Sequence, residues 1–340
     1  MTRRSTVAVL AWLSGSVFAL GQAPAQQGQP QGGAAGAFRE VTVTAIPGVV
    51  SAGARWTLVW QGTDNADGVV GTDDGGLLFA QEQPNRVSKL DRNDNVSIFV
   101  ESTRGAGALA IDAQGRVLAA QRTCTDPGRS APCSEPTAIG VVYPERERRI
   151  LADRFQGQSI GRPNDLLASR RGGVYFTSGG AYYLSPAGEV SSVGENLRAN
   201  GIVLSPDERV LYVTNGTAIV AFDIRADGAA TNQREFAKLE AGGTGDGLAV
   251  DGAGRLYVTS MGSGVQVFSP EGEYLGVIPT PRNVISAAFS GPEKRTLYVV
   301  GGGARSTDGT EVITPPGVRN NAKSIFKIPL LAQGFLGRAK

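Results

Sequence analysis

The chain has 340 residues, of which 41% are hydrophobic, with 33 basic and 31 acidic residues and a formal net charge of +2. This length can bury a substantial core, and the near balance of charge excludes a basic surface that binds nucleic acid. The sequence has no histidine, which excludes a Ser-His-Asp triad, a Cys-His pair and a histidine-ligated zinc or haem. Catalysis must therefore use carboxylates, amides, Arg, Lys, Tyr or a metal held by oxygen.

Residues 1–25 are typical of a cleavable signal peptide. Arg3 and Arg4 form the charged start, residues 7–20 form an apolar stretch, and residues 23–25 (A-P-A) form a small-residue cleavage site. A membrane anchor is the alternative, but the apolar stretch of about 14 residues is shorter than the roughly 20 that a membrane-spanning helix needs. We therefore predict a periplasmic or secreted protein that does not contact the membrane after cleavage.

Residues 26–37 (QQGQPQGGAAGA) have nothing to bury and are predicted to form a flexible polar leader. Cleavage after Ala25 removes two arginines and no acid, so the mature chain has equal numbers of basic and acidic residues. With no basic stripe, we expect a small molecule as the partner of a monomeric protein.

Residues 38–340 contain six copies of one pattern: a short apolar strand, a turn rich in Gly, Asp or Pro, and a second strand rich in Val, Leu and Tyr. The first residues of the copies are Asp67, Gly107, Asn164, Asn200, Asp246 and Ser286. A period of roughly 40–50 residues is typical of propeller blades. A solenoid is the alternative, but it needs polar end caps, and neither end of the sequence has the pattern of such a cap. The pattern predicts an all-β, six-bladed β-propeller in which strand-like segments 38–46 and 324–331 share a blade and close the ring.

Two cysteines, Cys124 and Cys133, lie in the polar stretch TCTDPGRSAPC. In an exported protein this spacing favours a local disulfide that closes a loop. A metal pair is the alternative, although no other thiol and no histidine could complete it.

The first residues of the blades are predicted to converge on one mouth of a central channel. Asp67, Asn164, Asn200 and Asp246 would crowd two carboxylates and two amides, which favours a cation between them. Hard oxygen donors select calcium or magnesium, or manganese. Ordinary turn formation by Asp-Gly and Asn-Gly pairs is the alternative. At the two remaining positions, Gly107 and Ser286 are expected only to leave room.

From about Gly68 to its C-terminus, the chain resembles the gluconolactonase family, which includes senescence marker protein (regucalcin), luciferin-regenerating enzyme and the drug-responsive lactonase of staphylococci. The resemblance is carried by R-P-N-D at residues 162–165, N-G at 200–201 followed by S-P-D and LYVT, G-D-G at 245–247 followed by GRLYVT, and the closing SIFKI. It implies a six-bladed propeller that holds one divalent cation, calcium first and zinc, manganese or magnesium as alternatives, and that hydrolyses lactones.

By this resemblance, Asn200 and Asp246 are metal ligands, and Asp246 also transfers protons. Arg162 and Asn164 contact the substrate. The first blade departs from the family, because Asp67 stands where relatives have Glu in an E-G-P context. Aspartate is one methylene shorter, so the ion must shift, a water must intervene, or the backbone must come closer.

Asp64 and Asp73 are alternative donors if the register is different. The predicted ligand set is Asp67, Asn200 and Asp246, with Asp246 as the catalytic residue.

The sequence therefore predicts a divalent-metal-dependent periplasmic hydrolase that opens a sugar lactone such as gluconolactone, or a related small ester. A non-catalytic, metal-stabilised propeller that binds a small molecule or a protein is one alternative. A related hydrolase or synthase with a non-lactone substrate is another.

Overall fold

The structure is a computed structural model that describes residues 39–62, 64–122, 136–303 and 324–337. Its regular elements are strands, apart from two single-turn 3-10 helices, η1 (Glu145–Glu147) and η2 (Pro292–Lys294). Across these ranges no helix is long and apolar enough to span a membrane. These elements confirm the predicted all-β class. The physical reason is that short apolar runs between Gly, Asp and Pro turns favour strands over helices.

The strands form six antiparallel sheets of four strands each, which are the blades. The first blade contains β2 (Val69–Gly71), β3 (Leu77–Gln81), β4 (Arg86–Leu90) and β5 (Val96–Glu101). The second contains β6 (Ala106–Ile111), β7 (Val117–Gln121), β8 (Ala138–Tyr143) and β9 (Arg149–Ala152). The third contains β12 (Leu166–Ala168), β13 (Val174–Ser178), β14 (Gly180–Leu184) and β15 (Val190–Val193).

The fourth blade contains β16 (Ala199–Leu204), β17 (Val210–Asn215), β18 (Ala218–Ile224) and β19 (Ala230–Lys238). The fifth contains β20 (Gly245–Val250), β21 (Leu256–Ser260), β22 (Gly264–Phe268) and β23 (Tyr274–Ile278). The sixth contains β24 (Val284–Ser290), β25 (Thr296–Gly301), β26 (Ser324–Pro329) and β1 (Thr57–Gln61). A small ribbon of β10 (Arg154–Phe155) and β11 (Gln158–Ser159) joins the second and third blades.

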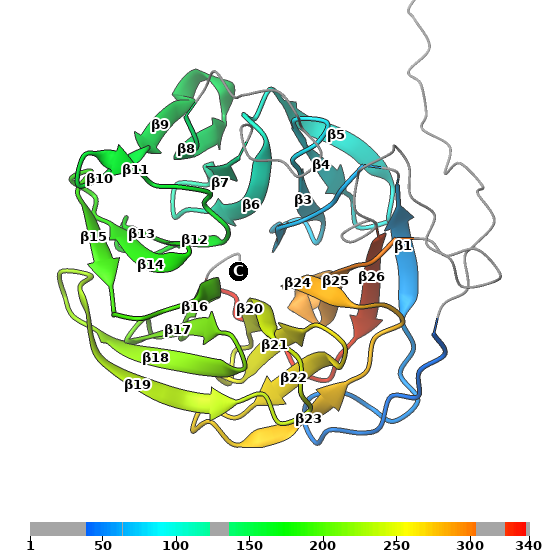
Figure 1. Cartoon of the computed structure of the whole chain (residues 1–340). Coiled ribbons are helices and arrows are strands. Elements are labelled where there is room, and N and C mark those ends of the chain that lie inside the picture. The colour runs from blue at the N-terminus through cyan, green and yellow to red at the C-terminus, as the bar shows by residue number, and fades with distance from the viewer. Residues whose placement is uncertain (1–38, 63, 123–135, 304–323, 338–340) are drawn as a thin grey trace, which may run out of the picture. The chain divides into compact units, whose positions relative to one another are not determined.

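The first strands of the blades contact one another in a closed cycle. β2 contacts β6, β6 contacts β12, β12 contacts β16, β16 contacts β20, β20 contacts β24, and β24 contacts β2. Figure 1 shows these strands around a common centre, with the fourth strand of each sheet at the rim. The predicted six-bladed β-propeller is confirmed.

The sixth blade combines strands from the two ends of the described chain, because β1 pairs antiparallel with β26. The N-terminal strand of this sheet is β1 and not the predicted segment 38–46. Residues 39–45 form no strand, and Ile46 makes only an isolated bridge with Val50. The apolar residues of that segment, Val43 and Ile46, instead pack into the core between the fifth and sixth blades.

Apolar side chains are buried between neighbouring blades. Each described cluster draws its members from two adjacent sheets, as Phe79 and Tyr298 do between the first and sixth blades. Strands such as β3 and β22 are buried at every position because both faces of the sheet are covered. Burial of one Leu or Phe side chain contributes about 1.5–3 kcal/mol. The packing between blades therefore fixes the positions of the residues at the ends of the first strands.

Residues 330–337 cross one end of this ring. The Phe335 N–H donates to Val250 O over 3.3 Å, and the Gly334 N–H donates to Lys294 O over 2.8 Å. Val250 is the last residue of β20, so this segment lies at the trailing ends of the first strands. The residues discussed below lie at the opposite, leading ends.

Candidate active site at the leading ends of the inner strands

The first residues of five of the six repeats lie at the same place in their blades, at the start of the innermost strand. In the sixth blade Ile285 takes this place, and Ser286 lies one residue further along. Asp67 and Asn164 come two residues before β2 and β12, while Asn200 and Asp246 are the second residues of β16 and β20. In β6, β16, β20 and β24 the strand pairing shifts register here. Such a bulge releases a side chain from regular alternation, so these side chains are free to leave the blade interior.

Glycine follows the leading residue in the first and fourth blades because the next blade comes very close. A Cβ on Gly68 would lie 2.5 Å from Ala108 Cα, and one on Gly201 would lie 2.1 Å from the carbonyl oxygen of Asp246. Neither glycine has a positive φ. The Asp-Gly and Asn-Gly pairs therefore allow close packing between blades, and the alternative that they are turn formers is wrong.

Buried threonines on the second strands hold the leading backbone in place. The hydroxyl of Thr214 accepts from the Gly201 N–H over 2.7 Å and donates to Asp246 O over 3.1 Å. One blade earlier, Thr177 Oγ1 donates to Asn200 O over 2.5 Å. Each hydroxyl ties its own blade to the leading residue of the next, and so fixes the spacing between neighbouring leading residues.

Arg122, which follows β7, places a buried guanidinium among the leading residues. Its side chain is 2% exposed, and Nη1 donates to Asp67 Oδ2 over 2.5 Å. Nη2 donates to the carbonyl oxygen of Asn164 and, over 3.0 Å, to Asn164 Oδ1, while Nε donates to Pro163 O over 2.7 Å. Burial lowers the pKa of Arg122, but the charges of Asp67 and Glu82 outweigh burial and raise this pKa overall. The guanidinium is therefore a permanent positive charge in the site.

Gly107, the leading residue of the second blade, makes room for this guanidinium. A Cβ on Gly107 would lie 2.1 Å from Arg122 Cζ. Gly107 leaves room, as the sequence predicts, and the side chain that fills this room is Arg122. Arg122 follows the second strand of the same blade.

Glu82, which follows β3, joins Arg122 to Arg162. Arg162 donates from Nη1 to Glu82 Oε1 and from Nη2 to Glu82 Oε2, each over 2.8 Å. Arg122 Nη1 lies 3.5 Å from Glu82 Oε2. The Glu82 side chain is 2% exposed while that of Arg162 is 34% exposed. Arg162 is thus held in one orientation by a two-point contact but keeps a surface that a small molecule could reach.

The two asparagines of the site contact each other. Asn164 Nδ2 donates to Asn200 Oδ1. A guanidinium has only donors, so the oxygen of Asn164 must face Arg122 and its NH2 group must face Asn200. The adjacent Asp165 is also fixed, since its Oδ2 accepts from the Ile202 N–H of the fourth blade over 3.1 Å.

Asp246 is the carboxyl group whose protonation the site perturbs most clearly. Burial raises its pKa well above the usual range, the charges of Asp67 and Asp165 raise it further, and Arg122 opposes them. Asp246 therefore lies close enough to Asp67 and Asp165 for their charges to act on it.

The charges of this cluster leave an excess of negative charge that fits a divalent cation. Four carboxylates and two guanidiniums are joined by the contacts and electrostatic effects above: Asp67, Glu82, Asp165, Asp246, Arg122 and Arg162. Among the described residues, no three His, Cys, Asp or Glu side chains group as a metal site. The oxygen donors at this place are the carboxylates of Asp67 and Asp246 and the amide oxygen of Asn200, which are donors of the kind that calcium and magnesium prefer.

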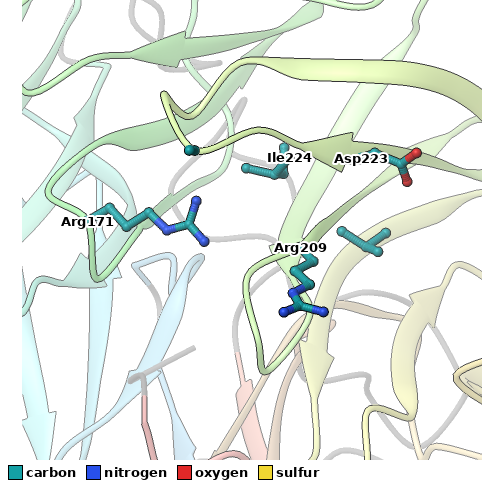
Figure 2. Close-up of a pocket in the computed structure, with 6 residues that line it drawn as sticks. Arg171, Arg209, Asp223 and Ile224 are labelled. Carbon is teal, nitrogen blue, oxygen red and sulfur yellow. The ribbon is translucent and has the colours of Figure 1, made fainter.

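A hollow of about 530 Å³ lies elsewhere, on the third and fourth blades, and Figure 2 shows its lining residues. Arg171 and Arg209 come from turns that follow β12 and β16, so the hollow is at the trailing ends of those strands. Its arginines already have partners: Arg171 donates to Arg225 O over 3.1 Å, and Arg209 lies 3.7 Å from Asp207. We assign it no part in the chemistry.

Comparison with known proteins decides the family. The family model described as SMP-30/Gluconolactonase/LRE-like region matches residues 65–302, more than half of the chain. The chain belongs to the SMP-30/gluconolactonase/LRE-like family. It is 27% identical over 268 residues to a gluconolactonase of Zymomonas mobilis, covering 66% of this chain and 72% of that protein. It is 33% identical over 264 residues to lactonase drp35 of Staphylococcus haemolyticus, covering 71% of this chain and 74% of that protein.

Solved structures in this family share the fold. A gluconolactonase of Xanthomonas campestris superimposes with a TM-score of 0.70 at 24% identity, covering 89% of this chain and 99% of that one. A calcium-binding regucalcin of Agrobacterium tumefaciens gives a TM-score of 0.61 at 17% identity, covering 82% and 95%. These matches show the same fold, while the family model confirms the family resemblance that the sequence motifs predict.

The structure brings the predicted site residues together: Asp67, Arg162, Asn164, Asn200 and Asp246 are linked through Arg122, Glu82 and the inter-blade contacts. Their roles stay predictions. Asp73, an alternative to Asp67, lies in the exposed turn after β2, at the other end of that strand. Reasoning from the sequence missed Arg122 and Glu82. Aligning the second strands would reveal them, because the residue after this strand is charged only in the first two blades.

Proposed function

We propose that the chain is a divalent-cation-dependent hydrolase that opens a sugar lactone such as gluconolactone, or a related small ester. The observation that carries the proposal is the gathering of Asp67, Asn164, Asn200 and Asp246 at the leading ends of the inner strands, through contacts with Arg122 and between the blades. Membership of a family whose curated relatives include a gluconolactonase and a lactonase supports this reaction class.

Asp67, Asn200 and Asp246 are the residues proposed to hold the cation. Their oxygen donors and the excess negative charge around them favour calcium, with magnesium, manganese and zinc as alternatives. The similarity to a calcium-binding regucalcin also supports calcium. A divalent cation bound here would polarise the carbonyl group of a lactone.

Asp246 is proposed as the catalytic residue. Its carboxylate would take a proton from the attacking water and return one to the ring oxygen that leaves. A cation bound to Asp246 would keep this carboxylate ionised and lower its basicity, so the attacking water would have to be made more acidic by the same ion.

Arg162 and Asn164 are proposed to bind the substrate. Arg162 is partly exposed, and Glu82 fixes its guanidinium, so its donors can meet a carbonyl or hydroxyl oxygen without a large loss of side-chain freedom. Asn164 is fixed by Arg122 on one side and Asn200 on the other, and would set the orientation of the ring.

We also propose that the protein is exported to the periplasm or secreted as a monomer, on the evidence of the N-terminal sequence. Residues 1–25 and 26–37, and the predicted disulfide between Cys124 and Cys133, lie outside the residues that the structure describes. Mass spectrometry of the mature protein from its natural host tests both the cleavage after Ala25 and the disulfide.

The test of the function is a panel of lactones assayed with chelated protein, to which calcium, magnesium, manganese or zinc is returned singly. We expect opening of at least one sugar lactone with one of these metals and none after chelation. If no lactone opens with any metal while the metal still raises the thermal stability, the binding-module alternative is correct. Hydrolysis of other esters only would favour the related-hydrolase alternative.

A further inference from the structure

Arg122 contacts both a proposed cation ligand and a proposed substrate-binding residue. Its N–H groups donate to Asp67 Oδ2, Pro163 O and the two oxygens of Asn164, and Nη1 also lies 3.5 Å from Glu82 Oε2. The side chain is only 2% exposed. Arg122 is therefore turned toward protein groups and not toward a substrate, and any effect on the chemistry must pass through the residues that it holds.

The first of these effects concerns Asp67. Arg122 engages Oδ2 of this carboxylate over 2.5 Å, which leaves Oδ1 as the oxygen for a cation. Carboxylate ligands in metal sites are usually oriented by a hydrogen bond to their second oxygen. A short aspartate side chain in the first blade can then serve as a ligand because Arg122 fixes the rotation of its carboxylate.

The second effect concerns the two asparagines. Because Arg122 can only donate, it makes Asn164 present its NH2 group to Asn200, and this NH2 group in turn requires the oxygen of Asn200. The identity of the atom that Asn200 turns toward Asn164 is thus determined two contacts away, at the guanidinium.

We propose that Arg122 is the positioning residue of the cation site, orienting the Asp67 carboxylate and, through Asn164, the oxygen of Asn200. Gly107 belongs to the same arrangement, because any side chain there would collide with the guanidinium. Glu82 forms an ion pair with Arg122 at 3.5 Å and with Arg162 at 2.8 Å, and so links the two arginines. This inference rests on the proposed function, since it assumes that a cation is bound at the site.

The experiment measures calcium binding to metal-free protein by titration calorimetry, with calcium alone as the ligand. Arg122→Lys keeps the positive charge but loses the planar fork of donors, and Gly107→Ala keeps Arg122 but displaces it. We expect each to weaken calcium binding at least tenfold. Arg116→Lys is the matched control, because Arg116 contacts Asp112 over 2.6 Å in the same blade, in the turn at the other end of β6. It should bind calcium as the wild type does.

A double variant separates positioning from a general loss of structure. Once Arg122→Ala has removed the guanidinium, Gly107→Ala has nothing to displace, so the double variant should bind calcium within about twofold of Arg122→Ala alone. Circular dichroism and thermal unfolding establish that each variant is folded. Should Arg122→Ala not fold, Arg122→Lys and Gly107→Ala still decide the question.

The outcomes are distinct. Wild-type protein that takes up no calcium would overturn the proposed cation site and this inference together. Wild-type protein that binds calcium, with Arg122→Lys and Gly107→Ala binding equally well, would overturn this inference alone. Independent, multiplicative losses from Gly107→Ala and Arg122→Ala would also overturn it.

Discussion

Asp67 acts electrostatically on Asp246: burial raises the pKa of Asp246, and the charge of Asp67 raises it further. The two residues lead the first and fifth blades, so their charges act on each other only because the blades form a ring. The proposed chemistry depends on this relationship, since two carboxylates that repel each other favour either a shared cation or a retained proton.

This relationship predicts that calcium affinity rises with pH. In the metal-free protein Asp246 keeps its proton to a higher pH than an ordinary aspartate, and calcium must displace that proton. Below the raised pKa, the affinity should rise up to tenfold for each pH unit, and titrations in buffers of different ionisation enthalpy should show release of about one proton. Affinity that stops rising at the ordinary pKa of an aspartate would contradict the prediction.

The stability of the metal-free protein should depend on pH in the opposite direction to the calcium affinity. Between the unfolded and folded pKa values of Asp246, the folded state binds more protons than the unfolded state, so the contribution of this group to stability falls as pH rises. Asp246→Asn removes the titration. The difference in unfolding free energy between wild type and Asp246→Asn, measured with urea after chelation, should therefore shift against the wild type as pH rises through this window.

Gly201→Ala tests the close approach of the fourth and fifth blades. The added Cβ would lie 2.1 Å from the carbonyl oxygen of Asp246, so one of the strands must move. We expect a loss of about 1–3 kcal/mol in unfolding free energy, together with weaker calcium binding. Gly252→Ala is the control, because its Cβ would lie 3.5 Å from its nearest neighbour. Equal effects of the two substitutions would show that the close approach is unimportant.

Thr214→Val tests the hydroxyl that bridges these blades. It leaves the Gly201 N–H without its acceptor and Asp246 O without its donor, at a cost of about 1–3 kcal/mol. Thr214→Ser should restore most of the stability because it restores the hydroxyl. Thr231→Val, at an exposed hydroxyl, should have little effect. Chemical denaturation measures the stability of all three variants. A Thr214→Val variant as stable as the wild type would show that this hydroxyl does not stabilise the contact between the blades.

These residues show why the sequence could predict the fold and the leading positions. A pattern such as Asp246-Gly-Leu-Ala-Val with LYVT after it repeats once per blade, and the repeat itself dictates that equivalent residues occupy equivalent places. The glycines after Asp67 and Asn200 do not reveal their role in the sequence, because an Asp-Gly or Asn-Gly pair suits a turn equally well. Only the neighbouring blade, brought near by ring formation, gives them their packing role.

Arg122 and Glu82 could not be predicted in the same way because they lie outside the repeated leading position. Each follows the second strand of its blade, where the other blades have Gly or Met. Their partners are Asp67, Asn164 and Arg162, residues of other blades or of other strands, and these contacts exist only in the assembled ring. Likewise, segment 38–46 alternates like a strand, but the outer edge of β26 is occupied by β1.

Glu82→Gln tests the orientation of Arg162. The amide offers one acceptor oxygen in place of two and removes the charge opposite the guanidinium, so the two-point contact is lost. We expect KM for the lactone to rise about tenfold with kcat little changed, since Arg162 is proposed to bind substrate and not to transfer protons. Glu101→Gln, at an exposed position of the same blade, is the control. A fall in kcat at unchanged KM would contradict this role.

The most direct test of the central claim is the rate of lactone opening by Asp246→Asn and Asp246→Ala beside the wild type, with calcium supplied and folding checked by circular dichroism. Removing a proton-transferring group costs about 10²–10⁴ in rate. The account predicts calcium-dependent opening by the wild type and at least a hundredfold loss of kcat in both folded variants. Wild-type turnover in either variant would contradict it, as would variants that lose only thermal stability while the wild type opens no lactone.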